Sequence, residues 1–109
     1  KMQSSTLSVF WDAFERDDIY YRVEILPVSG KTDSPYFVSR IQRPGSQRLD
    51  IKNTTAGEVN RLNELQSKES YMIRLSALLY EPGIDPWNDN YGYANIQAVS
   101  YFSTNFVWE

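Results

Sequence analysis

Apolar and polar side chains alternate along much of the chain, which is the pattern of strands that bury one face. The clearest segment is Tyr71–Leu79, whose odd-numbered positions are all apolar. Thr6–Trp11 alternates in the same way, and so does Ile19–Leu26, which carries Arg22 and Glu24 opposite its apolar face. Because successive side chains of a strand point to opposite faces, each segment should turn one face toward a shared core.

Three more segments are predicted to be strands, each bounded by turn-forming residues. They are Tyr36–Gln42, Gln47–Lys52 and Asn95–Phe102, with a tight turn at Pro44-Gly45 between the first two. In Asn95–Phe102, alternation places Ile96, Ala98 and Ser100 on one face and Val99 and Tyr101 on the other. The inner faces are expected to form one contiguous core of Leu7, Val9, Trp11, Tyr21, Val23, Ile25, Leu62, Ile73, Leu75 and Ala77.

The pattern over Gly57–Lys68 is compatible with two structures. Thr55-Ala-Gly-Glu58 has the form of a helix capping box, and Val59, Leu62 and Leu65 recur at roughly helical spacing. A short helix and a strand therefore both remain open for this stretch when it is taken alone.

Composition narrows the class of function. The 109 residues contain neither Cys nor His, so thiol nucleophiles, Ser-His arrangements, zinc sites and imidazole acid–base chemistry are excluded. The acidic residues of Asp12–Asp18 and the run Asn88-Asp89-Asn90 are interpreted as solvated surface rather than as a catalytic pair or calcium site. We therefore expect a non-catalytic domain with no cofactor and no bound metal.

Charge and hydropathy exclude two kinds of partner. The net charge is −3, and Lys and Arg are scattered without a cluster that could follow a phosphate backbone. Nucleic acid is therefore not expected as a partner. No apolar run approaches the ~20 residues that cross a bilayer, so no direct membrane insertion is expected within this chain. Aromatic residues make up 15% of the chain, a composition suited to half-buried strands and to protein interfaces.

One spacing carries a family resemblance. Leu65 precedes Tyr71 by six residues, and Tyr71 opens the alternating strand Ile73-Arg-Leu-Ser-Ala77. This arrangement resembles the fibronectin type III domain, in which a Leu and a Tyr bracket the crossing between strands E and F. The resemblance implies that the Tyr71 hydroxyl is hydrogen-bonded to backbone near Leu65–Lys68, as in a tyrosine corner.

Other segments extend the resemblance from Thr6 to Thr104. Leu7–Trp11 is similar to strand B with its core Trp, Tyr21–Val23 to strand C, and the stretch around Leu62 to strand E, which favours a strand there. The implied fold is an all-β, immunoglobulin-like (fibronectin type III) β-sandwich of about seven antiparallel strands. It would occupy residues 1–104, and residues 105–109 would begin a C-terminal linker.

Two departures from the family are expected to change the sandwich. Only Lys1–Ser5 precedes the first predicted strand, so strand A should be truncated, absent or supplied from outside. The stretch between strand C and Leu62 is long enough for an extra hairpin across Pro44-Gly45.

The resemblance implies an extracellular interaction or spacer module of a larger receptor or adhesion protein. Its partners would be another protein and neighbouring domains of the same chain. The connection Glu81–Gly92 and the residue next to it supply the expected contact residues, since loops at a sandwich end carry recognition. These are Ile84, Asp85, Trp87, Asp89, Tyr91 and Tyr93.

Alternatives to this function remain open. The chain could be an accessory or carbohydrate-binding domain of a secreted enzyme that stacks sugars on Trp87, Tyr91 and Tyr93. It could also be an intracellular module of the same fold. Asn53-Thr-Thr55 is an N-glycosylation sequon in a predicted loop, and its use would place the protein at the cell surface or outside the cell.

Overall fold

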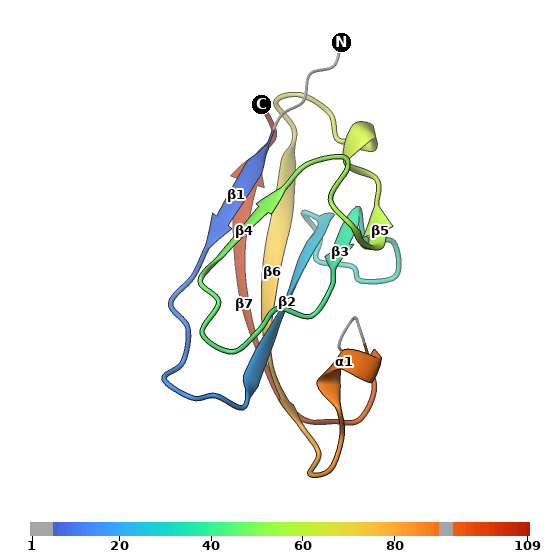
Figure 1. The fold of residues 1–109 in the computed structure, drawn as a ribbon. Helices are drawn as coiled ribbons and strands as arrows, with labels where there is room; N and C mark the ends of the chain where they lie inside the picture. Colours follow the sequence, from blue (N-terminus) through green and yellow to red (C-terminus); the bar gives the residue numbers. More distant parts are fainter. Residues whose placement is uncertain (1–5, 90–92) are drawn as a thin grey trace.

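A computed structural model describes residues 6–89 and 93–109, and in them the chain is all-β (Figure 1). The regular elements are β1 (Leu7–Phe10), β2 (Ile19–Pro27), β3 (Phe37–Ser39), β4 (Arg48–Ile51), β5 (Gly57–Asn60), the 3-10 turn η1 (Leu62–Glu64), β6 (Ser70–Tyr80), α1 (Pro86–Asp89) and β7 (Ile96–Val107). Among them, β2, β6 and β7 are long strands and the other strands have three or four residues.

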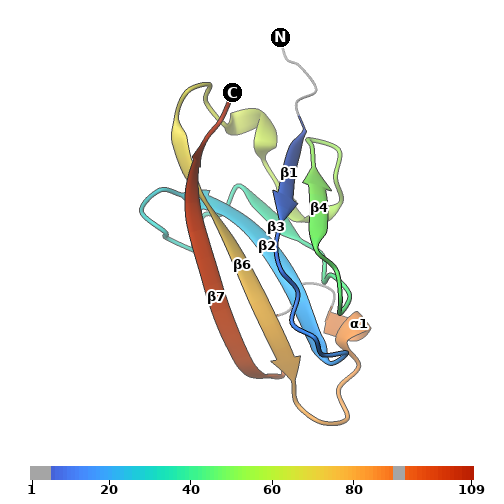
Figure 2. The same ribbon diagram turned by 90° about the vertical axis from the view of Figure 1, so that its left-hand side faces the viewer.

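The strands form two antiparallel sheets, as a β-sandwich requires. The small sheet pairs β1 with β4, and the large sheet has the order β5-β3-β2-β6-β7. Figure 2 shows the small sheet lying over one side of the large one. The predicted all-β, two-sheet class is therefore confirmed. No helix in the described part of the chain is long and apolar enough to cross a membrane.

The long strands β2 and β6 lie at the centre of the large sheet. Their antiparallel register runs from Ile19 opposite Leu79 to Pro27 opposite Tyr71. β2 has a neighbour on each side and is buried at nearly every position. Its two faces therefore both need covering, one by the small sheet and the other by a different part of the chain.

The face of β2 that carries Tyr21, Val23 and Ile25 packs between the sheets. The main core cluster contains most of the predicted core residues, and Tyr21 and Ala77 form a second cluster with Ile19. Trp11 and Leu75 pack against both clusters, so they make the core continuous. The prediction did not include Phe37 and Ile51, which are fully buried in the main cluster.

Tyr71 makes the contact that its spacing from Leu65 predicts. Its side chain is buried, and its hydroxyl accepts a hydrogen bond of 2.7 Å from the backbone N–H of Gln66. Tyr21 does the same at the start of β2, where its hydroxyl accepts a bond of 2.8 Å from the Phe14 N–H. Each ring thus ties a connecting segment to the core.

The hairpin expected across Pro44-Gly45 is absent, and that prediction is wrong. β3 and β4 flank the turn, but β3 pairs with β2 and β5 whereas β4 pairs with β1. The connection therefore crosses from one sheet to the other. The physical reason is that Ile51 is fully buried between the sheets, and only pairing with β1 places it there.

The stretch Gly57–Lys68 contains both of the structures that its pattern allows. β5 occupies its first four residues and η1 follows, so Leu62 lies on a 3-10 turn rather than on the expected strand. Leu62 and Leu65 still reach the core from this turn. Gly57 is required where β5 meets β3, because a Cβ there would lie 2.3 Å from the Val38 carbonyl oxygen.

The C-terminal strand extends beyond its predicted end. β7 runs to Val107 rather than to Thr104, and Phe106 and Trp108 pack against the main core. Trp108 also exchanges backbone hydrogen bonds with Lys68 and Glu69. Residues 105–108 of the expected linker are therefore held to the domain. The expected truncation of strand A concerns Lys1–Ser5, which lie outside the described residues.

A β-bulge at the start of β7 places the Ile96 side chain on the opposite face of the sheet from the one predicted. Leu79 pairs with Ala98, but Tyr80 pairs with Ile96, so one residue of β7 is skipped. Ile96 consequently lies on the same face as Val99 and Tyr101, not with Ala98 as alternation predicts. On that face it packs beside Tyr80.

Replacing Tyr71 by Phe should lower the free energy of unfolding by about 1–3 kcal/mol, because the Gln66 N–H would lose its acceptor. Chemical denaturation of both proteins measures the difference. Tyr101→Phe is the matched control, since that ring is half exposed, and it should change the value by less than about 0.5 kcal/mol. Equal effects of the two substitutions would show that the Tyr71 hydroxyl does not stabilise the fold.

Candidate functional site

The outer face of the large sheet, the one turned away from β1 and β4, carries charged residues that are buried. Arg22 and Glu24 on β2 are 3% and 1% exposed. A charge so far from water needs partners, because its desolvation costs several kcal/mol. Residues 81–89 and 93–95, between β6 and β7, supply part of the cover through Ile84 and Tyr93, and we call them the covering segment.

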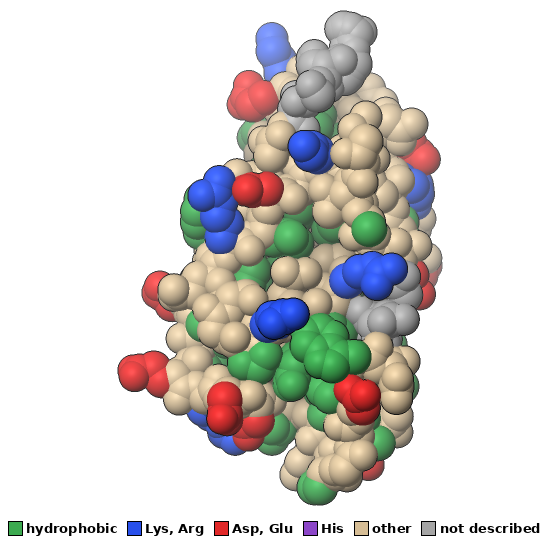
Figure 3. Space-filling view, viewed as in Figure 1, with side chains coloured by type: hydrophobic (Ala, Val, Ile, Leu, Met, Phe, Trp, Pro, Cys, Tyr) green, Lys and Arg blue, Asp and Glu red, His purple; other side chains and the backbone are tan. Residues whose placement is uncertain are grey.

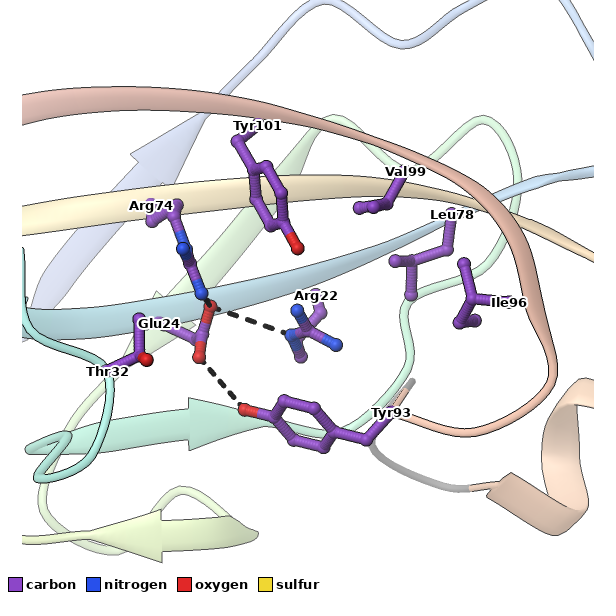
Figure 4. A pocket seen from close by; sticks show the side chains of 9 residues that line it. All are labelled: Arg22, Glu24, Thr32, Arg74, Leu78, Tyr93, Ile96, Val99 and Tyr101. Carbon is purple, nitrogen blue, oxygen red and sulfur yellow. Dashed lines mark hydrogen bonds and ion pairs between the residues drawn. The ribbon is translucent and has the colours of Figure 1, made fainter.

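Glu24 is the centre of the buried polar group (Figure 4). Its Oε1 accepts hydrogen bonds from Nε and Nη2 of Arg74 at 3.0 and 2.9 Å, and Nε of Arg22 lies 3.7 Å away. Its Oε2 accepts a bond of 2.9 Å from the Tyr93 hydroxyl. The register explains the first contact, because Glu24 and Arg74 are direct partners across β2 and β6.

Both arginines are also stacked on aromatic rings. The guanidinium carbon of Arg22 lies 4.1 Å from the centre of the Tyr93 ring, and that of Arg74 lies 4.4 Å from the Tyr101 ring. Arg22 also donates to the Ser76 hydroxyl at 3.2 Å. Burial and the neighbouring Glu24 carboxylate raise the pKa of Tyr93 above its usual value, so the hydroxyl stays a donor at neutral pH.

These side chains line a pocket of about 370 Å³ together with apolar residues of β6 and β7. Both oxygens of the Glu24 carboxylate already hold donors from the protein. The arrangement suits a structural tie between the sheet and the segment before β7 better than proton transfer.

The other end of the covering segment presents Trp87. Asp85 caps the single turn of α1 by accepting a bond of 3.0 Å from the Trp87 N–H. The Trp87 ring meets Tyr20 of β2 edge-on, with ring centres 5.7 Å apart, and the Arg43 guanidinium lies 5.8 Å from its centre. Trp87 is nevertheless 47% exposed, so a large ring is both fixed and open to solvent.

Trp87 borders a hollow between α1 and the connection from β3 to β4. The hollow measures about 480 Å³ and is lined by Ile41, Gln42, Arg43, Ser46 and Trp87, which we call the Trp87 surface. Figure 3 shows hydrophobic side chains gathered on this part of the face, with Lys or Arg side chains beside them. The surface thus combines an apolar ring with one cationic neighbour, Arg43.

The six contact residues predicted from the sequence have different environments. Trp87 is exposed, whereas Ile84 packs against the outer-face cluster of Ile41, Leu78 and Tyr80. Asp85 serves as the cap of α1, and Tyr93 binds Glu24. Tyr91 and the side chain of Asp89 lie outside the described residues. Asn53 is exposed in the turn between β4 and β5.

The sequence prediction missed the buried cluster of Arg22, Glu24 and Arg74. One signal was available, because the two most regular predicted strands each carry charge at the middle of an apolar run. Their pairing would have suggested a cross-strand ion pair. The contribution of Tyr93 had no such signal, since it depends on the path of the connection.

Comparison of the chain with family models, curated proteins and solved structures returns no match. The function is therefore inferred from the geometry of the described residues. In that geometry, the Glu24 cluster holds the covering segment in place, and this segment contributes Trp87 to the Trp87 surface.

Replacing Glu24 by Gln should lower the free energy of unfolding by about 3–5 kcal/mol or prevent folding, because two arginines would lose their buried counter-charge. Thermal and chemical denaturation measure the change. Asp50→Asn is the control, because Asp50 pairs with Arg48 at an exposed site, and it should shift the midpoint little. A Glu24→Gln protein as stable as the parent would contradict the assigned role.

Proposed function

We propose that the chain is a non-catalytic, fibronectin type III-like module of a larger receptor or adhesion protein. In this proposal the Trp87 surface binds a partner protein outside the cell. The observation that carries it is a half-exposed Trp held in one place by Tyr20 and Arg43. Tryptophan and arginine are the residues most often found at the energetic centre of protein interfaces.

The order of the strands supports the family assignment. In immunoglobulin-like sandwiches, strands B and E share one sheet and strands C, F and G share the other. If β1, β2, β6 and β7 correspond to B, C, F and G, then β4 takes the place of E by its pairing with β1. The Tyr71 hydroxyl bond at the start of β6 supports the same assignment. β5 is then an addition to the edge of the second sheet.

The fixed position of Trp87 supports a binding role for it. Tyr93 ties the C-terminal side of the connection to Glu24, and Ile84 packs its N-terminal side against the outer face. A side chain that is already ordered loses less entropy when it binds. The cationic group of Arg43 beside the ring favours a partner that offers carboxylates around an apolar contact.

The carbohydrate-binding alternative requires several aromatic rings to be presented together. Tyr93 points its hydroxyl into the protein and stacks one face of its ring on Arg22. Trp87 instead contacts Tyr20 on β2. Both rings are about half exposed, but they contact different parts of the sheet, which favours a protein partner over a flat sugar platform.

Replacing Trp87 by Ala should weaken partner binding by about 2 kcal/mol or more, which is roughly thirtyfold in Kd. The fold should lose only about 1 kcal/mol, the value of an aromatic pair. A panel of purified ectodomains and a panel of polysaccharides can be probed with the parent domain, and the hits titrated with the variant.

Val28→Ala is the control for this experiment, because Val28 is 51% exposed and follows the opposite end of β2. It should leave both affinity and melting temperature unchanged. Binding that survives Trp87→Ala while the melting temperature falls would identify Trp87 as a covering residue only. Hits confined to polysaccharides would support the carbohydrate-binding alternative.

Expression through a eukaryotic secretory pathway should attach a glycan at Asn53, because the sequon lies in an exposed turn. Enzymatic deglycosylation should then lower the apparent mass, and Asn53→Gln should abolish the shift. Absence of a glycan on the secreted parent domain would remove the support that this sequon gives to an extracellular location.

A further inference from the structure

The long strand β7 lies at the edge of the large sheet. It has 12 residues and pairs on one side with β6, and no other described strand pairs with it. Figure 2 shows β7 as the outermost strand of its sheet. Every second residue of an antiparallel strand directs its N–H and C=O away from the paired neighbour. β7 therefore offers a row of backbone donors and acceptors to another strand.

The sequence of β7 lacks the devices that usually protect such an edge. Ile-Gln-Ala-Val-Ser-Tyr-Phe-Ser-Thr-Asn-Phe-Val contains no charged residue and no Pro. Soluble proteins generally place Lys, Pro or a bulge on an exposed edge to prevent pairing with another chain. The bulge in β7 lies at its first residues, which leaves the rest of the strand regular.

The opposite edge of the sheet is protected in the ways that β7 is not. β5 has only four residues, one of which is Glu58, and its pairing with β3 is interrupted by an irregularity at Val38 and Ser39. A sheet with one protected edge and one open edge can pair with another sheet only through the open edge. After that pairing, neither outer edge of the joined sheet accepts a further strand. Such pairing gives a closed dimer with two-fold symmetry rather than a filament.

Both faces of β7 carry exposed apolar side chains. Val99 and Tyr101 lie on the outer face, where Arg74 holds the Tyr101 ring. Phe102 lies on the inner face beside Phe14, and both rings are about half exposed. A strand added to this edge would cover these rings on both sides of the sheet, and aromatic cross-strand pairs stabilise such an addition.

We propose that β7 pairs with the β7 of a second copy of this chain, antiparallel, to join the two large sheets into one. A second copy fits because the strand is neutral throughout, so self-pairing sets no like charges opposite each other in any register. It also brings Tyr101 and Phe102 of each copy next to the aromatic residues of the other. The proposal is independent of the Trp87 surface, which belongs to α1 and the β3–β4 connection.

Sedimentation velocity on the full chain from about 1 µM to about 1 mM tests the proposal. The parent protein should pass from monomer to dimer with rising concentration and form no larger species. Thr104→Lys combined with Asn105→Lys should weaken the dimer by about tenfold or more, because the symmetric edge would then bring like charges together. Both residues are exposed and face the uncharged Ile73 and Met72 on β6, so the β6–β7 pairing should persist.

A control with the same added charge is Ser34→Lys combined with Asn63→Lys, both at exposed positions away from β7. It should dimerise like the parent. Amide hydrogen exchange supplies a second measurement: β7 should gain protection at high concentration while β5 does not. A monomer at every concentration, a dimer that the β7 variant retains, or a dimer without added protection in β7 would each overturn the proposal.

Discussion

The carboxylate of Glu24 is buried in the middle of a sheet, and much of the outer face is arranged around it. An ion in that position is tolerable only when cationic groups and hydrogen-bond donors surround it. Arg74 supplies them from the neighbouring strand, because the register sets the two residues opposite each other. Tyr93 supplies another from outside the sheet, so the chain must pass over β2 before it enters β7.

The hydrogen bond between Tyr93 and Glu24 fixes the chain on both sides of Tyr93. On one side, Ile84 enters the apolar cluster around Leu78, and α1 is placed where Trp87 meets Tyr20. On the other side, β7 begins with a bulge that turns Ile96 onto the covered face. A buried ion cluster of this kind contributes less to net stability than apolar packing would. We interpret its role as specifying one route for the connection.

The sequence predicted the inner half of the molecule better than the outer half. Alternation located β2 and β6, and the resemblance carried by the Leu65–Tyr71 spacing implied the bond from the Gln66 N–H to the Tyr71 hydroxyl. Both patterns lie within short stretches of sequence. They can therefore be recognised without knowing how the rest of the chain folds. The pairing of β4 with β1 could not be predicted in this way, because it is decided by which sheet buries Ile51.

The candidate site was predicted only in part for a related reason. An aromatic residue in a loop can cover the core, tie the loop to the sheet, or face solvent, and its sequence neighbours do not distinguish these roles. In the structure, Ile84 covers the outer face, Tyr93 ties the loop through its hydroxyl, and Trp87 packs on Tyr20, while the Tyr93 and Trp87 rings are both about half exposed. The difference arises from the charged face of β2, since Glu24 draws the Tyr93 hydroxyl inward and Tyr20 supports the Trp87 ring. The residues that determine the path of the loop are therefore on β2, beneath it. A substitution at Glu24 should change the position of the Trp87 ring, although the two side chains are not in contact.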